Sequence, residues 1–199
     1  MKKLAGILLF VLFTFASLNA QNTEWNFDKA HSKIQFTVSH LVISSVTGEF
    51  NEFDGTVKTN GDDFSNSKIS FVVKTNSINT DNEKRDNHLK SDDFFNAAQY
   101  PEIKFIGKEM KKVGENKYKL IGDFTIRNVT KEIDLDVTKG GIINDPWGNK
   151  VAAFTIDGTI NRFDYNLKWN KLLEVGGAVV GEDVDIHCKV ELIQSKDEA

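Results

Sequence analysis

Cysteine and proline are scarce in this chain. Cys188 is the only cysteine among 199 residues, so no disulfide can form within the chain. It lies in an alternating apolar run from Val184 to Leu192, which predicts a small buried hydrophobic side chain; a reactive thiol is the alternative. With only two prolines, few positions interrupt the hydrogen bonds of a strand. The fold must therefore be held by its core and not by covalent cross-links.

An excess of positive charge is also lacking. The sequence has 25 basic and 29 acidic residues, and without the two lysines of the first twenty residues the balance is 23 to 29. Proteins that bind nucleic acids generally need a basic surface to neutralise phosphates. A partner of that class is not expected.

Long apolar runs are confined to the N-terminus. Lys2 and Lys3 precede an apolar run from Leu4 to Phe15, and Ala20 is a small residue suited to signal-peptidase cleavage. This pattern predicts a signal peptide over residues 1–20 and one mature domain over residues 21–199; an N-terminal membrane anchor is the alternative. We therefore expect a periplasmic or secreted protein with no stable membrane insertion after cleavage.

Apolar and polar residues alternate along most of the mature chain, as they do in half-buried strands. Ile34, Phe36 and Val38 share one face of an expected strand over 33–39. A hairpin is expected to turn near 127–130, because alternation runs through both flanking segments. Further strands are expected over 48–58, 68–74, 104–110, 118–126, 133–137, 154–160 and 180–193.

About eight to ten such segments, joined by turns, predict an all-β fold. An eight-stranded antiparallel barrel is favoured because closure removes exposed strand edges; a sandwich of two sheets is the alternative. A barrel of eight strands is either filled by its own side chains or holds one ligand. The many phenylalanines would supply large apolar walls for either.

One charged stretch, residues 79–101, breaks the alternation and predicts a short helical insert. Asn79 or Thr80 would cap a helix, and Ser91 a second turn. Phe94 and Phe95 are then expected to press onto the barrel. The insert would lie across a mouth or flank of the barrel, either as a salt-bridged structural element or in contact with a ligand.

Several short motifs, in order along nearly the whole mature chain, resemble the YceI-like family. The matching residues are Trp25, Asp28, His31, Ser32, Phe36, His40, Gly48, Phe50, 77–80, 85–89, 93–95, 100–101, 122–126, 129–131, Trp147, Gly148 and 160–165. The resemblance implies a lipocalin-like barrel, exported to the bacterial periplasm or beyond. It also implies an apolar tunnel for a polyisoprenoid or another long-chain amphiphile, with no catalysis and no cofactor. A homodimer is compatible with it.

One motif differs from the sequence that is usual in the family. Where many relatives have Phe-Gly-Leu, this chain has Tyr165, Asn166 and Leu167. The change is expected to reshape that end of the cavity.

The expected ligand contacts form two groups. Apolar walls suit a polyisoprenoid chain, which offers only apolar surface, whereas hydrogen-bonding groups are needed only at the head group. The expected lipid-binding residues are Phe36, Val38, Phe71, Phe105, Phe124, Ile126, Phe154 and Ile156 for the walls, and His40, Arg85, His88 and Arg162 for the polar end.

Two other classes of function compete with this reading. A hydrolase or metal-dependent enzyme would use His88 and its neighbours, but Asp86, His88 and Ser91 lie within one short segment without a nucleophile elbow. The four histidines have no H-x-x-x-H spacing, so only a cluster formed in three dimensions would hold a metal. A stress-related structural protein with a filled barrel is the third class. We expect no catalytic residue and no metal ligand.

Overall fold

The computed structural model describes residues 22–172, 174 and 176–196. The expected signal peptide over residues 1–20 lies outside them. Within the described part of the chain, no helix is both long and apolar enough to cross a bilayer.

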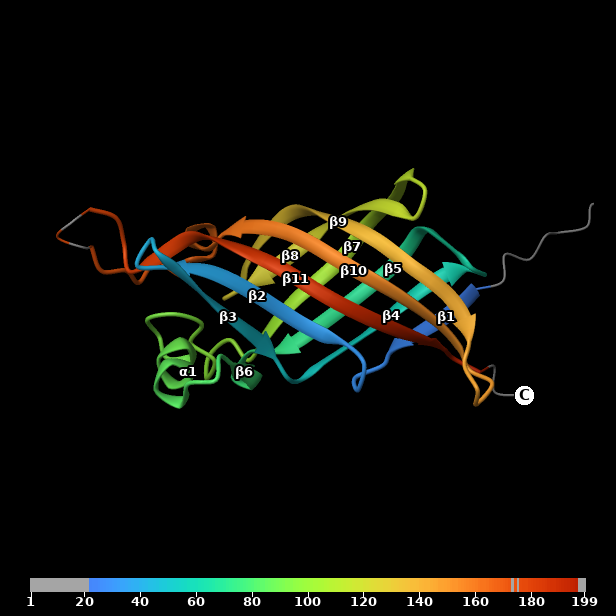
Figure 1. Ribbon diagram of the computed structural model, residues 1–199, viewed down its shortest axis with the longest axis horizontal. Coiled ribbons are helices and arrows are strands. Elements are labelled where there is room, and N and C mark those ends of the chain that lie inside the picture. The colour runs from blue at the N-terminus through green and yellow to red at the C-terminus, as the bar shows by residue number, and fades with distance from the viewer. Residues whose placement is uncertain (1–21, 173, 175, 197–199) are drawn as a thin grey trace, which may run out of the picture.

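Antiparallel strands form a barrel around an apolar interior (Figure 1). In the described part of the chain eleven strands belong to one sheet, and the only α-helix is α1. The elements are β1 (Asn22–Phe27), β2 (Lys33–His40), β3 (Ser44–Phe50), β4 (Phe53–Asn60), β5 (Asp63–Lys74), the 3₁₀ turn η1 (Thr75–Ser77), β6 (Ile78–Asn79), α1 (Glu83–Lys90), β7 (Glu102–Gly114), β8 (Lys117–Ile126), β9 (Val129–Asn144), β10 (Lys150–Asn161), the 3₁₀ turn η2 (Arg162–Tyr165) and β11 (Val180–Gln194).

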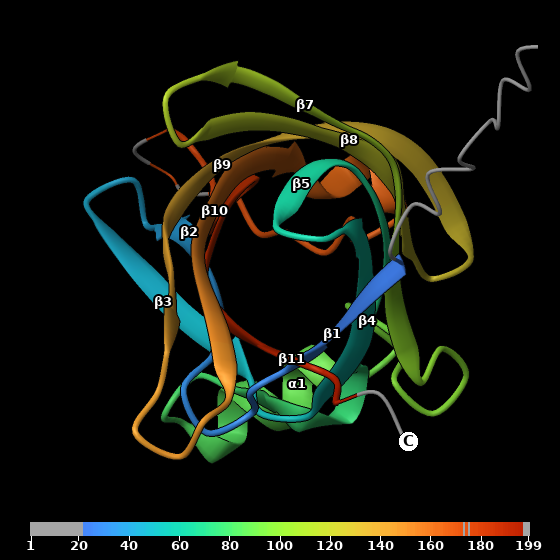
Figure 2. The ribbon, with the colours of Figure 1, turned by 90° about the vertical axis from the view of Figure 1, so that its right-hand side faces the viewer.

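Eight of the described strands close a ring, which confirms the predicted eight-stranded antiparallel barrel. The order is β1, β4, β5, β7, β8, β9, β10 and β11, and β1 pairs again with β11. Figure 2 looks along the barrel and shows this ring. Closure leaves none of these eight strands with a fully open edge, as expected for an all-β chain of this length.

The remaining strands lengthen the barrel wall. The long strand β11 pairs with β2 from Val180 to Lys189 and with β1 from Leu192 to Gln194. β2 then pairs with β3, and β3 pairs with β6. Each added strand is separated from a ring strand only by a short break, so the eleven segments occupy about eight positions around the barrel.

The helical insert fills a gap in this longer part. β7 pairs with β5 but not with β6, and α1 lies beside β3 and β6 in Figure 1. The helix starts later than predicted: Asn82 is the cap, and its side chain accepts a hydrogen bond from the Arg85 amide at 2.9 Å. Thr80 is unavailable as a cap because it binds the buried carboxylate of Asp86.

The predicted second helical turn is absent from the described structure. Ser91 instead ends α1, and its hydroxyl donates to the His88 carbonyl at 2.7 Å. Residues 92–99 form non-helical turns. Phe94 is buried and Phe95 packs against the core, as the sequence had indicated.

Candidate functional site

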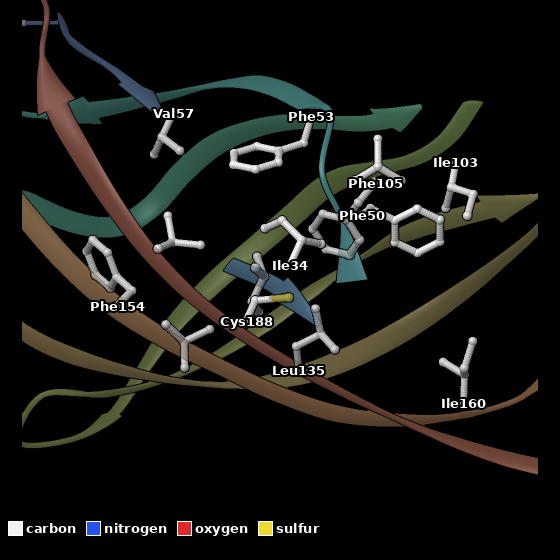
Figure 3. Close-up of a cluster of buried hydrophobic side chains, with 14 of the residues drawn as sticks. Ile34, Phe50, Phe53, Val57, Ile103, Phe105, Leu135, Phe154, Ile160 and Cys188 are labelled. Carbon is white, nitrogen blue, oxygen red and sulfur yellow. The ribbon is translucent and has the colours of Figure 1, made fainter. Parts of the chain in front are cut away.

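The barrel interior contains an apolar cavity of about 240 Å³. Nine phenylalanines line it, and among its lining residues only Gln35, Lys104 and Arg162 have polar or charged side chains. Inward-facing residues of several strands meet there, as Figure 3 shows for Ile34 of β2, Leu135 of β9 and Cys188 of β11. An interior of this kind suits a long apolar molecule, and its described lining contains no cluster of polar groups for a small polar substrate.

Aromatic side chains close one end of the cavity. Phe154 lines the cavity, and its ring lies 4.8 Å from that of Phe64, which lies 5.2 Å from Trp25. Trp25 is fully buried, and its indole N–H donates to the Thr59 hydroxyl at 2.9 Å. The satisfied indole N–H and the packed rings make this end a fixed wall.

Loops and the insert close the other end. Arg127, in the turn between β8 and β9, donates through Nη1 to the carbonyls of Asp92, Phe94 and Asn166 at 3.3, 2.7 and 3.0 Å. One guanidinium therefore joins the insert to the segment after η2. No pattern in the sequence predicted this junction.

An aromatic cluster strengthens the same closure. The His88 ring stands edge-on to Phe94 and Trp169, with centroids 5.1 and 5.0 Å away. His88 Nε2 also lies 2.8 Å from the carboxylate of Asp93. His88 therefore holds the insert against the loop that contains Trp169.

Arg162 is the buried charge beside the cavity. It is 3% exposed, and its guanidinium donates to the carbonyls of Gly181 (2.7 Å), Trp169 (2.9 Å), Val180 (3.3 Å) and Leu167. Burial lowers the pKa of this guanidinium, and the nearby Glu182 opposes the shift. The group stays charged because arginine does not lose its proton in proteins.

A second buried polar group lies in the same 3₁₀ turn. Tyr165 is 1% exposed, and its hydroxyl is the one buried side-chain polar atom of the described residues without a hydrogen-bond partner. Burial raises the pKa of Tyr165 to about 12. The following Asn166 adopts a left-handed conformation with φ of 62°, which asparagine tolerates better than most residues in place of glycine. Compared with the Phe-Gly pair of many relatives, the Tyr165-Asn166 pair thus retains the tight turn and adds a hydroxyl group.

The twelve predicted contact residues divide clearly by position. All eight predicted wall residues line the cavity, and so does Arg162. His40, Arg85 and His88 are not among the lining residues. His40 ends β2, and Arg85 donates to the Thr80 hydroxyl and carbonyl at 2.8 and 2.6 Å. Whether any of the twelve contacts a ligand stays a prediction.

Residues of the insert enlarge the predicted wall. Leu89, Phe94 and Phe95 all line the cavity. The sequence predicted that Phe94 and Phe95 would pack on the barrel, but it did not predict that they would line a cavity. The insert is therefore part of the cavity wall and not only a cover outside it.

The side chains considered for an enzymatic or metal site form other hydrogen bonds. The Ser91 hydroxyl donates to a backbone carbonyl, and the Asp86 carboxylate accepts from Thr80, so neither is paired with the His88 ring. Only one group of three potential metal ligands occurs among the described residues, Asp28, His31 and Glu191, with ligand atoms within 4.8 Å of one another. His31 Nδ1 already lies 2.8 Å from the Asp28 carboxylate, and this hydrogen bond raises the pKa of His31.

Cys188 should be almost unreactive in the folded protein. It lies in the cavity wall, and burial raises its thiol pKa to about 11. At pH 8 only about one thiol in a thousand is then ionised, and the thiolate is the reacting form. We expect labelling by a thiol-specific disulfide reagent to be at least ~100-fold slower than in denaturant. Equal rates in native and denatured protein would contradict the burial of Cys188.

Comparison with known proteins shows which family this chain resembles in sequence and fold. The model for the YceI-like domain matches residues 25–192. A UPF0312 protein of Staphylococcus aureus (strain N315) is 42% identical over 170 residues, which cover 85% of this chain and 96% of that protein.

Solved structures agree with this match. A Campylobacter jejuni YceI protein superposes with a TM-score of 0.67 at 29% identity, covering 79% of this chain and 90% of that chain. Burkholderia cenocepacia BcnA gives 0.72 at 19% identity, with 83% and 98% covered. A polyisoprenoid-binding domain from Saccharophagus degradans, implicated in plant cell wall breakdown, gives 0.62 at 18%, with 86% and 98% covered. The chain belongs to the YceI-like family.

Proposed function

We propose that this protein is an exported binding or carrier protein for a long-chain amphiphile such as a polyisoprenoid. The observation that carries the proposal is the apolar cavity inside the barrel, whose wall includes nine phenylalanines. Enclosing a few hundred Å² of an apolar chain supplies several kcal/mol at ~25 cal/mol per Å², before the cost of ordering the chain. The polyisoprenoid-binding domain of Saccharophagus degradans has the same fold.

The polar end of the ligand is assigned to the end of the cavity that contains Arg162. This guanidinium is the buried positive charge of the cavity wall, and the hydroxyl of Tyr165 lies in the same turn. The Tyr165 hydroxyl has no hydrogen-bond partner among the described residues, and a head-group acceptor that reached it would satisfy it, because a buried donor without a partner costs free energy. The Arg162 guanidinium already donates to four backbone carbonyls, so it would act on the head group mainly through its charge. Export is proposed from residues 1–20, whose pattern is that of a signal peptide.

An enzymatic role is less well supported. The Ser91 hydroxyl and the Asp86 carboxylate are bound to other groups, and His88 lies outside the group of three potential metal ligands. A filled structural barrel is disfavoured because the interior retains a cavity of about 240 Å³. We therefore propose that the protein binds its ligand without catalysis.

Native mass spectrometry tests the proposal. Protein expressed with its complete N-terminus in a bacterial host is expected to lose residues 1–20 and to have additional mass from a co-purified lipid. Extraction with organic solvent should remove that mass and release a long-chain molecule. Identical masses before and after extraction, together with no thermal protection by an added isoprenoid or fatty acid, would refute the carrier function.

A further inference from the structure

Three large apolar side chains are exposed at one end of the barrel. Val42 and Ile43, in the turn between β2 and β3, are 68% and 87% exposed, and Leu172, in the loop before β11, is 81% exposed. We name these three residues the apolar tip. Both segments extend at the left end of the barrel in Figure 1.

The two segments of the apolar tip are fixed to each other. The Leu41 amide donates to the Val179 carbonyl at 3.0 Å, and a Cβ atom placed on Gly177 would lie 2.8 Å from Cγ2 of Val42. Leu172 pairs with Ala178 across its own loop. Val42 and Ile43 are therefore presented beside the loop of Leu172 by a hydrogen-bonded framework.

The turn that exposes Val42 and Ile43 has an unfavourable backbone conformation. Leu41 and Val42 have φ values of 54° and 65°, a left-handed conformation that suits glycine, asparagine and aspartate. For a β-branched residue such as Val42 this conformation is a genuine outlier, and such strain clusters at functional sites. Neither the strain nor the exposure of Val42 and Ile43 is explained by packing within the barrel.

The cavity wall continues toward the apolar tip. Val38 and Val180 line the cavity, and Val180 pairs with His40, the residue before Leu41. The tip thus begins where the wall of the proposed lipid cavity ends. Because a long apolar molecule is stored in membranes and not in water, a surface at this position would face the source of the ligand.

The chemistry of the apolar tip suits a bilayer better than a protein. The surface of three side chains on two turns is far smaller than the ~800 Å² that each partner buries in a stable protein interface. The charges around the tip nearly balance: Lys168, Lys171 and Glu174 lie in the described part of the loop, and Glu182 and Asp183 are exposed near the start of β11. Exposed aliphatic side chains of this kind can insert shallowly between lipid head groups, and their burial there supplies the binding free energy.

We propose that the apolar tip docks the protein reversibly on a lipid bilayer, from which the cavity is loaded. The loading step rests on the proposed function, whereas docking is measurable by itself. The mature protein is sedimented with vesicles of phosphatidylcholine alone, or of phosphatidylcholine and phosphatidylglycerol at 3:1. The wild type is expected to bind both, because the apolar side chains and not a basic surface provide the contact.

A matched pair of variants tests the role of the tip. Ile43→Asp is expected to lower the vesicle partition coefficient at least tenfold, whereas Ile143→Asp should leave it unchanged. Ile143 is 66% exposed but lies near the β9–β10 turn, at the opposite end of the barrel. Circular dichroism and bound-lipid mass confirm that both variants are folded and loaded.

Several results would overturn the docking proposal without affecting the carrier function. One is a lipid-loaded wild type that does not sediment with either vesicle. Another is equal loss of binding in Ile43→Asp and Ile143→Asp, or binding to anionic vesicles that survives Ile43→Asp. A wild-type dimer that dissociates on Ile43→Asp, without vesicle binding, would make the tip an interface between two copies.

Discussion

Replacement of Arg162 by methionine is expected to destabilise the barrel by about 3–4 kcal/mol. The guanidinium donates to four backbone carbonyls, which belong to the segment after η2 and to the start of β11. Methionine has a similar length but no donors, so these carbonyls would lose their partners in a site where Arg162 is only 3% exposed. Unsatisfied buried acceptors cost more than the net value of the hydrogen bonds themselves.

Urea unfolding followed by tryptophan fluorescence measures this effect, and Arg127→Met is the matched control. Arg127 also donates to three backbone carbonyls, but it is only partly buried. Water replaces lost donors there, so a cost of about 1 kcal/mol is expected. Equal costs at both positions would show that burial does not determine the effect. If Arg162→Met fails to fold, Arg162→Lys, which retains the charge but not the fork of donors, should be intermediate.

The strands that the sequence predicted are those whose pattern is local. The expected strand over 33–39 corresponds to β2, and the hairpin near 127–130 turns between β8 and β9. Alternation with a period of two is visible within the sequence of a single strand, so each strand can be predicted without knowing its partners. The buried and exposed faces of such strands follow from the same pattern.

Breaks within the strands could not be predicted in this way. The segment over 48–58 was expected to be one strand, yet it is divided between β3 and β4. The division is set by a distant partner: Asn51 and Glu52 donate through their amides to the carbonyl and hydroxyl of Ser77 at 3.2 and 3.0 Å. No pattern within 48–58 identifies Ser77 as that partner.

The candidate site shows the same division between apolar and polar side chains. Phe36, Phe124 and the other wall residues line the cavity because their strand face determines their direction. Arg85 and His88 were expected near a ligand because of their chemistry, whereas in the structure Arg85 binds Thr80 and the His88 ring stands edge-on to Phe94 and Trp169. A long polar side chain selects its partner in three dimensions, and sequence spacing does not reveal that choice.

Cys188→Phe is expected to weaken lipid binding at least tenfold while leaving the barrel folded. Cys188 lines the cavity and lies among the buried side chains of Figure 3, and a phenyl ring there would occupy a large part of a cavity of about 240 Å³. Because the ring enters open space in an apolar environment, it should avoid most of the ~1–3 kcal/mol that overpacking of a filled core costs. The affinity for an isoprenoid should fall at least tenfold, which corresponds to ~1.4 kcal/mol.

The control is Cys188→Ala, which removes the thiol without adding volume and should retain the co-purified lipid. Native mass spectrometry compares the bound mass of both variants with that of the wild type, and urea unfolding verifies that each is folded. Ile186→Phe, which introduces a ring from the neighbouring inward position of β11, should act like Cys188→Phe. Full lipid occupancy in both phenylalanine variants would place the ligand outside this cavity and refute the assignment. Loss of lipid in Cys188→Ala as well would instead attribute binding to the thiol, since that variant leaves the open space intact.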